Sequence, residues 1–408
     1  MFRLKVFITF PDGQKVFCGE LFTTPPDNRG KIQGSFQYSR QYLEHPMAFA
    51  LDPQSLPLGT QEYFTDRPEG VHGVFEDALP DDWGRVLLAK KANLSRKDQT
   101  VPKLLEVLAI KGLGALSFES KSDRVINESS ADIHRLDSLV KAAMQFDAGE
   151  PMDNQSLQEL FSCGSSPGGA RPKALIKKGD NSFWIAKIPK LNDSFGVESL
   201  EAASLKMARS AGLPVPDFEI HNVADRKILL VRRFDVSDKG GRYHMISMKT
   251  LLNAEGYYYL SYSHLFQAIQ KYSSRPSRDI ELLFRQMVFN IAIGNTDDHL
   301  KNFCILHLES GFCLSPVYDI LPDIHFNREH RLSFPQGAGT LQPHRATLER
   351  TGLIYHVPSP ARIIDKVFQV VSNWKNVFQD HGVSIYDIQR LEKSINKRLQ
   401  MLDPLKSK

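Results

Sequence analysis

Three polar residues in the second half of the chain have the types and spacing that phosphoryl transfer needs. Asp297 and Asn302 lie in the segment GNTDDHLKNF as Asp-x-x-x-x-Asn, and Asp319 follows in VYDI. An aspartate so placed can accept the proton of an acceptor hydroxyl, while an asparagine and a second aspartate can bind magnesium ions. Because this chemistry depends mostly on positioning and charge neutralisation, the elements that hold these side chains matter as much as the residues themselves.

The segments around these residues predict how they are held. Residues 281–294, ELLFRQMVFNIAIG, carry apolar side chains at helical spacing and end at Gly294, which predicts a buried helix that stops just before the loop. Residues 303–316, FCILHLESGFCLSP, predict two short strands joined by a tight turn, and this hairpin would bring Asn302 and Asp319 side by side. The bare Asp-x-x-x-x-Asn pattern also occurs in ordinary polar loops. It is the context that favours a catalytic loop.

A second group of residues upstream suits a triphosphate. The strand-like run FWIAKIP, residues 183–189, has Lys187 in its middle, and the helical segment that follows contains Glu198 and Glu201. Kinases hold the α- and β-phosphates with a strand lysine that pairs with a helix glutamate. A solvent-facing lysine on an edge strand is the alternative.

A glycine-bearing segment precedes that strand. Residues 163–176, CGSSPGGARPKALI, resemble neither the Walker pattern nor the kinase GxGxxG, but glycine lets backbone N–H groups approach phosphate oxygens closely. Taken alone, the segment also suits an ordinary surface turn.

The order of these motifs resembles one family along nearly the whole chain. SSPGGARPK, WIAKIPK, a glutamate-bearing helix ending in GLPVP, LLVRRFD, NTDDHLKN and LSPVYDIL follow one another as in the HipA family of bacterial serine/threonine kinases, the toxins of toxin–antitoxin pairs. The hairpin LKVFITF–PDGQ–KVFCGELF and the segments FEDALPDDWGR and VPKLLEVLAIKGLGALSF are similar to that family's N-terminal subdomain.

The resemblance implies a role for each matching residue. Asp297 corresponds to the catalytic base, and Asn302 and Asp319 correspond to the magnesium ligands. The nucleotide-binding positions implied are Lys187 at the ATP phosphates, Gly168, Gly169, Ala170 and Arg171 in the phosphate-covering loop, Glu201, the hinge Arg233, Phe234 and Asp235, and His299, Asn302 and Asp319. Ser166, or Ser165 beside it, corresponds to the serine that family members phosphorylate on themselves.

Two positions depart from the family's usual pattern. Leu200 stands where an asparagine often precedes the helix glutamate, and Arg232 stands where the hinge often carries an acidic residue. Neither position belongs to the Asp–Asn–Asp set, so the resemblance still implies an active enzyme.

The resemblance also implies the fold. We expect an α+β, two-lobed, protein-kinase-like (HipA-like) fold with a β-rich N-terminal subdomain and a mostly helical C-terminal lobe. The expected parts are residues 1–120 as the N-terminal subdomain, 121–240 as connector and kinase N-lobe, and 241–408 as the helical C-lobe with the catalytic loop. The last segment predicts a terminal helix that begins at Ser384.

Composition excludes several other classes. The 408 residues include no apolar run of transmembrane length and no secretion signal, so we expect a cytoplasmic protein with no membrane partner. The net charge of +4 does not by itself indicate nucleic-acid binding. The four cysteines lack zinc spacing and predict buried, reduced thiols. The stretch 321–346 is polar and contains proline and glycine, which predicts a surface loop rather than a metal site. It contains His325, His330 and His344.

The sequence therefore predicts a kinase that uses ATP and Mg²⁺ to phosphorylate serine or threonine in a cellular protein and in itself. The resemblance implies a small helix-turn-helix antitoxin (HipB-like) as partner, with DNA contacted only indirectly through it. Two alternatives stay open: a kinase for a lipid or small-molecule hydroxyl, and a nucleotide-binding partner protein without transfer activity.

Overall fold

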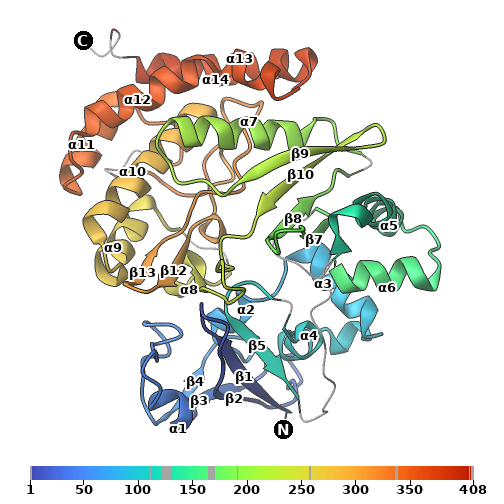
Figure 1. The fold of residues 1–408 in the computed structure, drawn as a ribbon. Helices are drawn as coiled ribbons and strands as arrows, with labels where there is room; N and C mark the ends of the chain where they lie inside the picture. Colours follow the sequence, from blue (N-terminus) through green and yellow to red (C-terminus); the bar gives the residue numbers. More distant parts are fainter. Residues whose placement is uncertain are drawn as a thin grey trace. The chain divides into compact units, whose positions relative to one another are not determined.

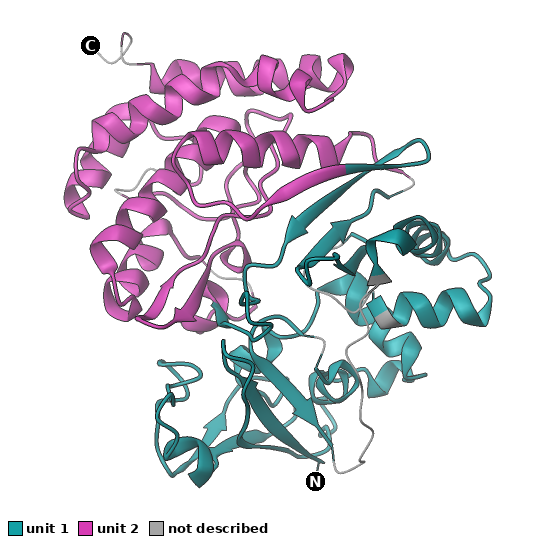
Figure 2. Ribbon diagram, viewed as in Figure 1, with its two compact units in different colours: residues 1–191, 221–246 teal, residues 192–220, 247–408 magenta. Residues whose placement is uncertain are grey.

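The computed structural model describes residues 2–110, 112–120, 131–163, 171–190, 192–256, 259–335, 339–403 and 405. Within them the chain is mixed α+β, β-rich towards the N-terminus and mostly helical towards the C-terminus, which confirms the expected fold class (Figure 1). It divides into two compact units, residues 1–191 with 221–246 and residues 192–220 with 247–408 (Figure 2). We describe each unit by itself, and the three-part division at 120 and 240 stays a prediction.

The first unit begins with the predicted hairpin. Strands β1 (Phe2–Thr9) and β2 (Lys15–Thr23) pair antiparallel across the PDGQ turn. The sheet has the order β4-β3-β2-β1-β5, with β3 (Gly34–Tyr38), β4 (Glu62–Thr65) and β5 (Leu116–Glu119). Its inner face is apolar at every second residue, because alternate side chains of a strand point to opposite faces.

Short helices accompany this sheet in the chain. They are α1 (Arg40–Leu43), α2 (Gly73–Glu76), α3 (Asp82–Lys91), η1 (Arg96–Asp98) and α4 (Val101–Leu108). Helices α3 and α4 overlap the segments FEDALPDDWGR and VPKLLEVLAIKGLGALSF.

The second sheet of the first unit has the order β6-β7-β8-β10-β9. Its strands are β6 (Ala131–Asp132), β7 (Lys173–Lys177), β8 (Phe183–Lys187), β9 (Phe218–Val223) and β10 (Arg226–Arg232). One face packs in a hydrophobic cluster with α5 (Leu136–Ala148), which follows η2 (Ile133–Arg135), and with α6 (Asn154–Cys163). Ala174, Trp184 and Ala186 point into this cluster, so Lys173 and Lys187 lie on the other face.

The second unit is mainly helical. Its elements are α7 (Val197–Ser210), α8 (Met248–Leu251), α9 (Tyr262–Tyr272), α10 (Pro276–Ile293), η3 (Leu300–Asn302), β12 (Cys304–Leu308), β13 (Gly311–Leu314), α11 (Arg345–Ile354), α12 (Pro360–Ser372), α13 (Trp374–Asp380) and α14 (Ile385–Leu402). Strand β11 (His244–Ser247) stands where the chain enters this unit.

Helix α10 is the central helix of this unit. Pro276 occupies its first turn, where no N–H is needed, and Gly294 ends it in the left-handed conformation. Helices α9, α12 and α14 pack around it (Figure 1). Ser384 caps α14 by accepting a hydrogen bond from the backbone N–H of Asp387, as the sequence predicts.

Among the helices that the structure describes, none is both long and apolar enough to cross a bilayer. All four cysteines are buried and free, as the sequence predicted.

Candidate active site

The predicted catalytic loop leaves the end of α10 through a well-defined stop. Gly294 has φ of +81°, and its N–H and that of Asn295 both donate to the carbonyl of Asn290, at 3.0 and 2.9 Å. The side chain of Asn295 also donates to Asn290 Oδ1, at 3.1 Å. A buried helix and paired amides therefore fix where the loop begins.

Asp297 reaches solvent from this loop. Its side chain is 60% exposed, and its Oδ1 accepts a hydrogen bond from Arg331 Nε at 3.4 Å. The backbone carbonyl of Asp297 accepts from Asn302 Nδ2 at 2.9 Å, across η3. The catalytic-base candidate is thus accessible to an acceptor hydroxyl, while its main chain is tied to the first metal-ligand candidate.

The predicted hairpin brings the segment before Asp319 to the end of the loop. β12 and β13 pair from Ile305↔Leu314 to Leu308↔Gly311, and Ser315 N donates to Cys304 O at 2.9 Å. Tyr318 Oη then donates to Lys301 O at 2.7 Å. The immediate chain neighbours of Asn302 and Asp319 are therefore in contact.

The donor chemistry of these two residues fits magnesium. Because Asn302 uses Nδ2 to reach Asp297 O, its Oδ1 remains for a cation. An amide oxygen and a carboxylate are the hard ligands that magnesium prefers, with phosphate oxygens and water completing the shell. Among the described residues, no group of three His, Cys, Asp or Glu side chains could hold a metal ion.

The upstream lysine lies on the face of its sheet opposite the hydrophobic cluster. Lys187 ends β8 and is half-buried, on the face opposite the hydrophobic cluster. Its direct cross-strand partner on β7 is Lys173, which is only 7% exposed. Both side chains thus lie on one face of the sheet, and Lys173 is not among the site residues that the sequence predicted.

Other predicted nucleotide contacts are only partly described. Glu198 and Glu201 are both buried on α7. Arg171 is half-buried, whereas Ser165, Ser166, Gly168, Gly169 and Ala170 lie outside the residues that the structure describes. The roles implied for all of these residues stay predictions.

The predicted hinge residues form a buried ion pair. Arg233 Nη2 lies 2.6 Å from Asp235 Oδ2 and also donates to Gly112 O, while Gly114 N donates to Asp235. Burial alone would raise the pKa of Asp235, but the charges of Arg233 and Arg242 outweigh it, so that pKa lies below its ordinary value. These contacts tie the hinge to the 112–114 turn. Phe234 is half-buried, and its contact with adenine stays a prediction.

Sequence reasoning missed a buried polar network behind the loop. Asp298 accepts from Tyr262 Oη at 2.7 Å and from His330 Nδ1 at 2.9 Å, and Arg398 Nη1 lies 3.4 Å from His330 Nε2. The prediction that His330 belongs to a surface loop is wrong, because its side chain is 1% exposed. Only the pairing of distant segments reveals this network, so no local pattern could have signalled it.

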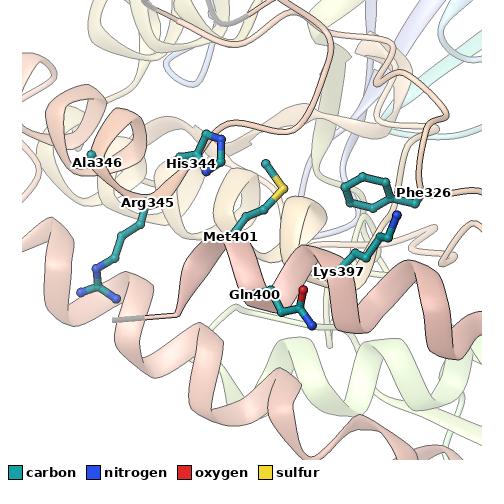
Figure 3. Close-up of a pocket in the computed structure, with 7 residues that line it drawn as sticks. All are labelled: Phe326, His344, Arg345, Ala346, Lys397, Gln400 and Met401. Carbon is teal, nitrogen blue, oxygen red and sulfur yellow. The ribbon is translucent and has the colours of Figure 1, made fainter. Parts of the chain in front are cut away.

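A hollow of about 540 Å³ lies between α11 and α14 (Figure 3). It is lined by Phe326, His344, Arg345, Ala346, Lys397, Gln400 and Met401. None of these is a predicted site residue, so this hollow gives no support to the catalytic assignment.

Comparison with known proteins shows the family. The family model "HipA-like C-terminal domain" matches residues 165–374, and the model "HipA N-terminal domain" matches residues 15–119. The two matches together cover most of the predicted N-terminal subdomain and the segment from the glycine-bearing loop to beyond the hairpin.

Two curated relatives match only part of this chain. "Putative kinase Y4mE" of Sinorhizobium fredii is 30% identical over 152 residues, 35% of this chain and 35% of its own length. "Putative kinase Y4dM" of the same organism is 26% identical over 165 residues, 36% of this chain and 39% of its own. The matched part thus spans little more than a third of either relative.

A solved structure shares the fold. The HipA chain in the Shewanella oneidensis MR-1 complex of HipA, HipB and operator DNA matches with a TM-score of 0.69 at 15% identity, over 97% of this chain and 96% of that one. At this identity the likeness establishes the fold.

Proposed function

The chain belongs to the HipA family, and on that premise we propose that it is an ATP- and magnesium-dependent serine/threonine protein kinase. One observation carries the proposal: the exposed carboxylate of Asp297 stands on a rigidly held loop whose main chain is bonded to Asn302. The names of the two curated relatives support the same reaction class.

In this proposal each residue has a separate task. Asp297 accepts the proton of the acceptor hydroxyl and orients its oxygen. Asn302 Oδ1 and the Asp319 carboxylate would hold magnesium, which when bound neutralises phosphate charge. Lys187, with Glu201 as its proposed helix partner, binds the α- and β-phosphates, and the 233–235 hinge and His299 contact the rest of the nucleotide.

The acceptor class needs a direct test. We expect radiolabel from γ-labelled ATP to appear on serine or threonine of protein, in a magnesium-dependent reaction that chelation stops. A panel with a serine/threonine peptide library, phosphatidylinositol vesicles and small polyols compares the classes. Label confined to the lipid or polyol arm would replace the protein-kinase proposal by that alternative. Nucleotide binding without label in any arm would favour the partner protein without transfer activity.

The proposal includes phosphorylation of the chain on Ser166 or Ser165. A phosphate adds roughly −1.5 to −2 charge at neutral pH, which would repel the triphosphate from a loop meant to cover it. Tryptic mass spectrometry after incubation with ATP should place phosphate on one of these serines in the wild type and on neither in Asp297→Ala. An active kinase with both serines unmodified would remove this part of the proposal.

The partner proposal is a small helix-turn-helix, HipB-like antitoxin, with the chain acting as a cytoplasmic toxin. The Shewanella complex contains HipA, HipB and operator DNA, and the net charge of +4 here gives little attraction to DNA alone. Co-expression with a neighbouring helix-turn-helix gene product should yield a co-purified complex that binds operator DNA. Tight, salt-sensitive operator binding by this chain alone would contradict the indirect route.

A further inference from the structure

We propose that Asp298 is a positioning residue: its buried carboxylate fixes the loop that presents Asp297 to the acceptor. The inference rests on the proposed phosphoryl transfer and assigns a role in it to a residue that the motif leaves without one. It begins from the opposite environments of two consecutive aspartates. Asp297 is 60% exposed at its side chain, whereas Asp298 is 0% exposed.

The Asp298 carboxylate is bonded on both oxygens. Oδ1 accepts from the backbone N–H of Arg331 at 2.8 Å, and Oδ2 accepts from Tyr262 Oη at 2.7 Å and His330 Nδ1 at 2.9 Å. Burial, and then the charge of Asp298, raise the pKa of Tyr262 well above its ordinary value, so its hydroxyl keeps the proton that it donates. A carboxylate held by three donors from two elements has no freedom to bind a ligand. It serves as an anchor.

The contacts of His330 also fix which of its ring nitrogens donates a hydrogen bond. Its Nδ1 faces a carboxylate and must donate, while its Nε2 faces Arg398 Nη1, which can only donate. His330 therefore carries a proton on Nδ1, and its ring links the Asp298 carboxylate to the Arg398 guanidinium. The buried charges of Asp298 and Arg398 compensate each other through the ring.

Arg398 joins this line of groups to the rest of the unit. It is 0% exposed on α14, and it donates to Gln342 Oε1 at 2.7 Å and to Phe326 O at 3.1 Å. A Cβ built at Gly294 would lie 2.9 Å from Arg398 Nε, so the guanidinium packs against the end of α10. The C-terminus of a helix favours a cation. Helix α14 thus supports both the start of the loop and its anchor.

The anchor reaches the reacting group by two routes. The first is the peptide that joins Asp297 to Asp298. The second is Arg331, whose N–H is held by Asp298 and whose Nε lies 3.4 Å from Asp297 Oδ1. Tyr262 extends the support to the loop's beginning, because it accepts from Asn290 Nδ2 at 3.2 Å and Asn290 pairs with Asn295. Loss of the anchor should therefore displace Asp297 without changing its chemistry.

The test compares Asp298→Ala and Asp298→Asn with wild type, at a temperature well below the unfolding midpoint of each protein. A displaced base lowers kcat, and a displacement of about 1 Å typically costs about 10²-fold. We expect kcat per folded molecule to fall on that order in Asp298→Ala and less in Asp298→Asn, whose oxygen can still accept. The KM for ATP should stay within about twofold, because the nucleotide is held by other groups.

Thr351→Ala is the matched control. Thr351 is also buried in the second unit, 1% exposed, and its Oγ1 donates to Thr347 O at 2.8 Å within α11, a helix that carries no proposed site residue. It should lower the unfolding midpoint and leave kcat unchanged. Hydrogen exchange of residues 294–303 should rise in the two Asp298 variants and not in the control. This measurement still tests the inference if a variant is too unstable for kinetics.

The outcomes separate the inference from the proposed function. Absence of transfer in the wild type would overturn the proposed function. The positioning role would be overturned if the wild type is active and Asp298→Ala has the same kcat and the same hydrogen exchange of the loop as Thr351→Ala. The kinase assignment would then still stand.

Discussion

Asp319 holds a strained backbone conformation at the place where the proposal needs a metal ligand. Its φ is +57°, in the left-handed region that costs most residues with a side chain roughly 1–2 kcal/mol. Aspartate and asparagine tolerate this region best, since their side chains bond locally. Such strain is retained at sites where a group must be aimed.

This conformation gives a prediction with an internal control. Asp319→Asn should keep the unfolding midpoint near that of wild type but lose magnesium-dependent ATP binding, because the charge is gone and the backbone preference remains. Asp319→Ala should also lose magnesium-dependent ATP binding. Its free energy of unfolding should in addition fall by about 1 kcal/mol, because alanine does not favour the left-handed backbone conformation. Calorimetry with and without magnesium, beside a thermal melt, provides the data. Full magnesium-dependent binding in Asp319→Asn would remove this residue from the metal site.

Lys187 should contribute to phosphate binding and not to adenine binding. Lys187→Ala should therefore weaken ATP binding while leaving adenosine binding nearly unchanged, because an ammonium acts here as a point charge for phosphates. Lys177→Ala, at the other end of the neighbouring strand β7, is the control and should change neither. Equal losses for ATP and adenosine in calorimetry would mean that Lys187 is structural.

At the scale of elements, local patterns were enough to predict those that carry the site. Gly294 ends α10, Ser384 begins α14, and two short apolar runs joined by a tight turn define the β12–β13 hairpin. Each signal lies within a few residues of the element that it specifies. The contacts of Asp298 with His330 and of His330 with Arg398 join distant segments, so the sequence could name the loop but not what holds it.

Gly294 ends α10 beside Arg398 of α14. Substitution of Gly294 should show how closely these two residues pack. In Gly294→Ala the new Cβ would meet Arg398 Nε at 2.9 Å, in addition to the strain of φ +81°. We expect unfolding free energy to fall by about 1–3 kcal/mol beyond the backbone cost. Gly256→Ala, at φ +58° with nothing within 4 Å, measures that backbone cost alone. If urea unfolding gave the two variants equal losses, Arg398 would not be packed against the helix end.

At the scale of the whole molecule, two compact units share one chain, and the sequence did not reveal how it passes between them. Residues 192–220 cluster with the helical unit although they lie between strands of the first. The predicted connector and kinase N-lobe, residues 121–240, includes this segment, and that division stays a prediction. Which residues cluster depends on tertiary contacts that periodicity does not encode.

Acid should destabilise the first unit through a buried histidine. Burial, and then the charge of Arg67, lower the pKa of His72 from its ordinary 6.5 to about 4. Between these values the unfolded chain binds the proton and the folded one does not, so stability is present above pH 6.5 and is lost as pH falls towards 4. His72 alone should cost about 2 kcal/mol of unfolding free energy between pH 7 and pH 5.

The variant His72→Leu isolates this contribution. It should show a smaller loss of unfolding free energy between pH 7 and pH 5 in urea titrations followed by tryptophan fluorescence. An identical pH dependence in variant and wild type would show that His72 is not the group that titrates.

The central claim is that Asp297 accepts the acceptor's proton in a magnesium-dependent phosphoryl transfer. The most direct measurement is the intact mass of wild type and Asp297→Ala after incubation with ATP and magnesium, with Glu309→Ala at the hairpin turn as control. The account predicts that wild type and Glu309→Ala gain phosphoryl mass, and that Asp297→Ala gains none while still binding ATP, because its fold and nucleotide contacts are intact. A wild-type gain of phosphoryl mass by Asp297→Ala would contradict the account.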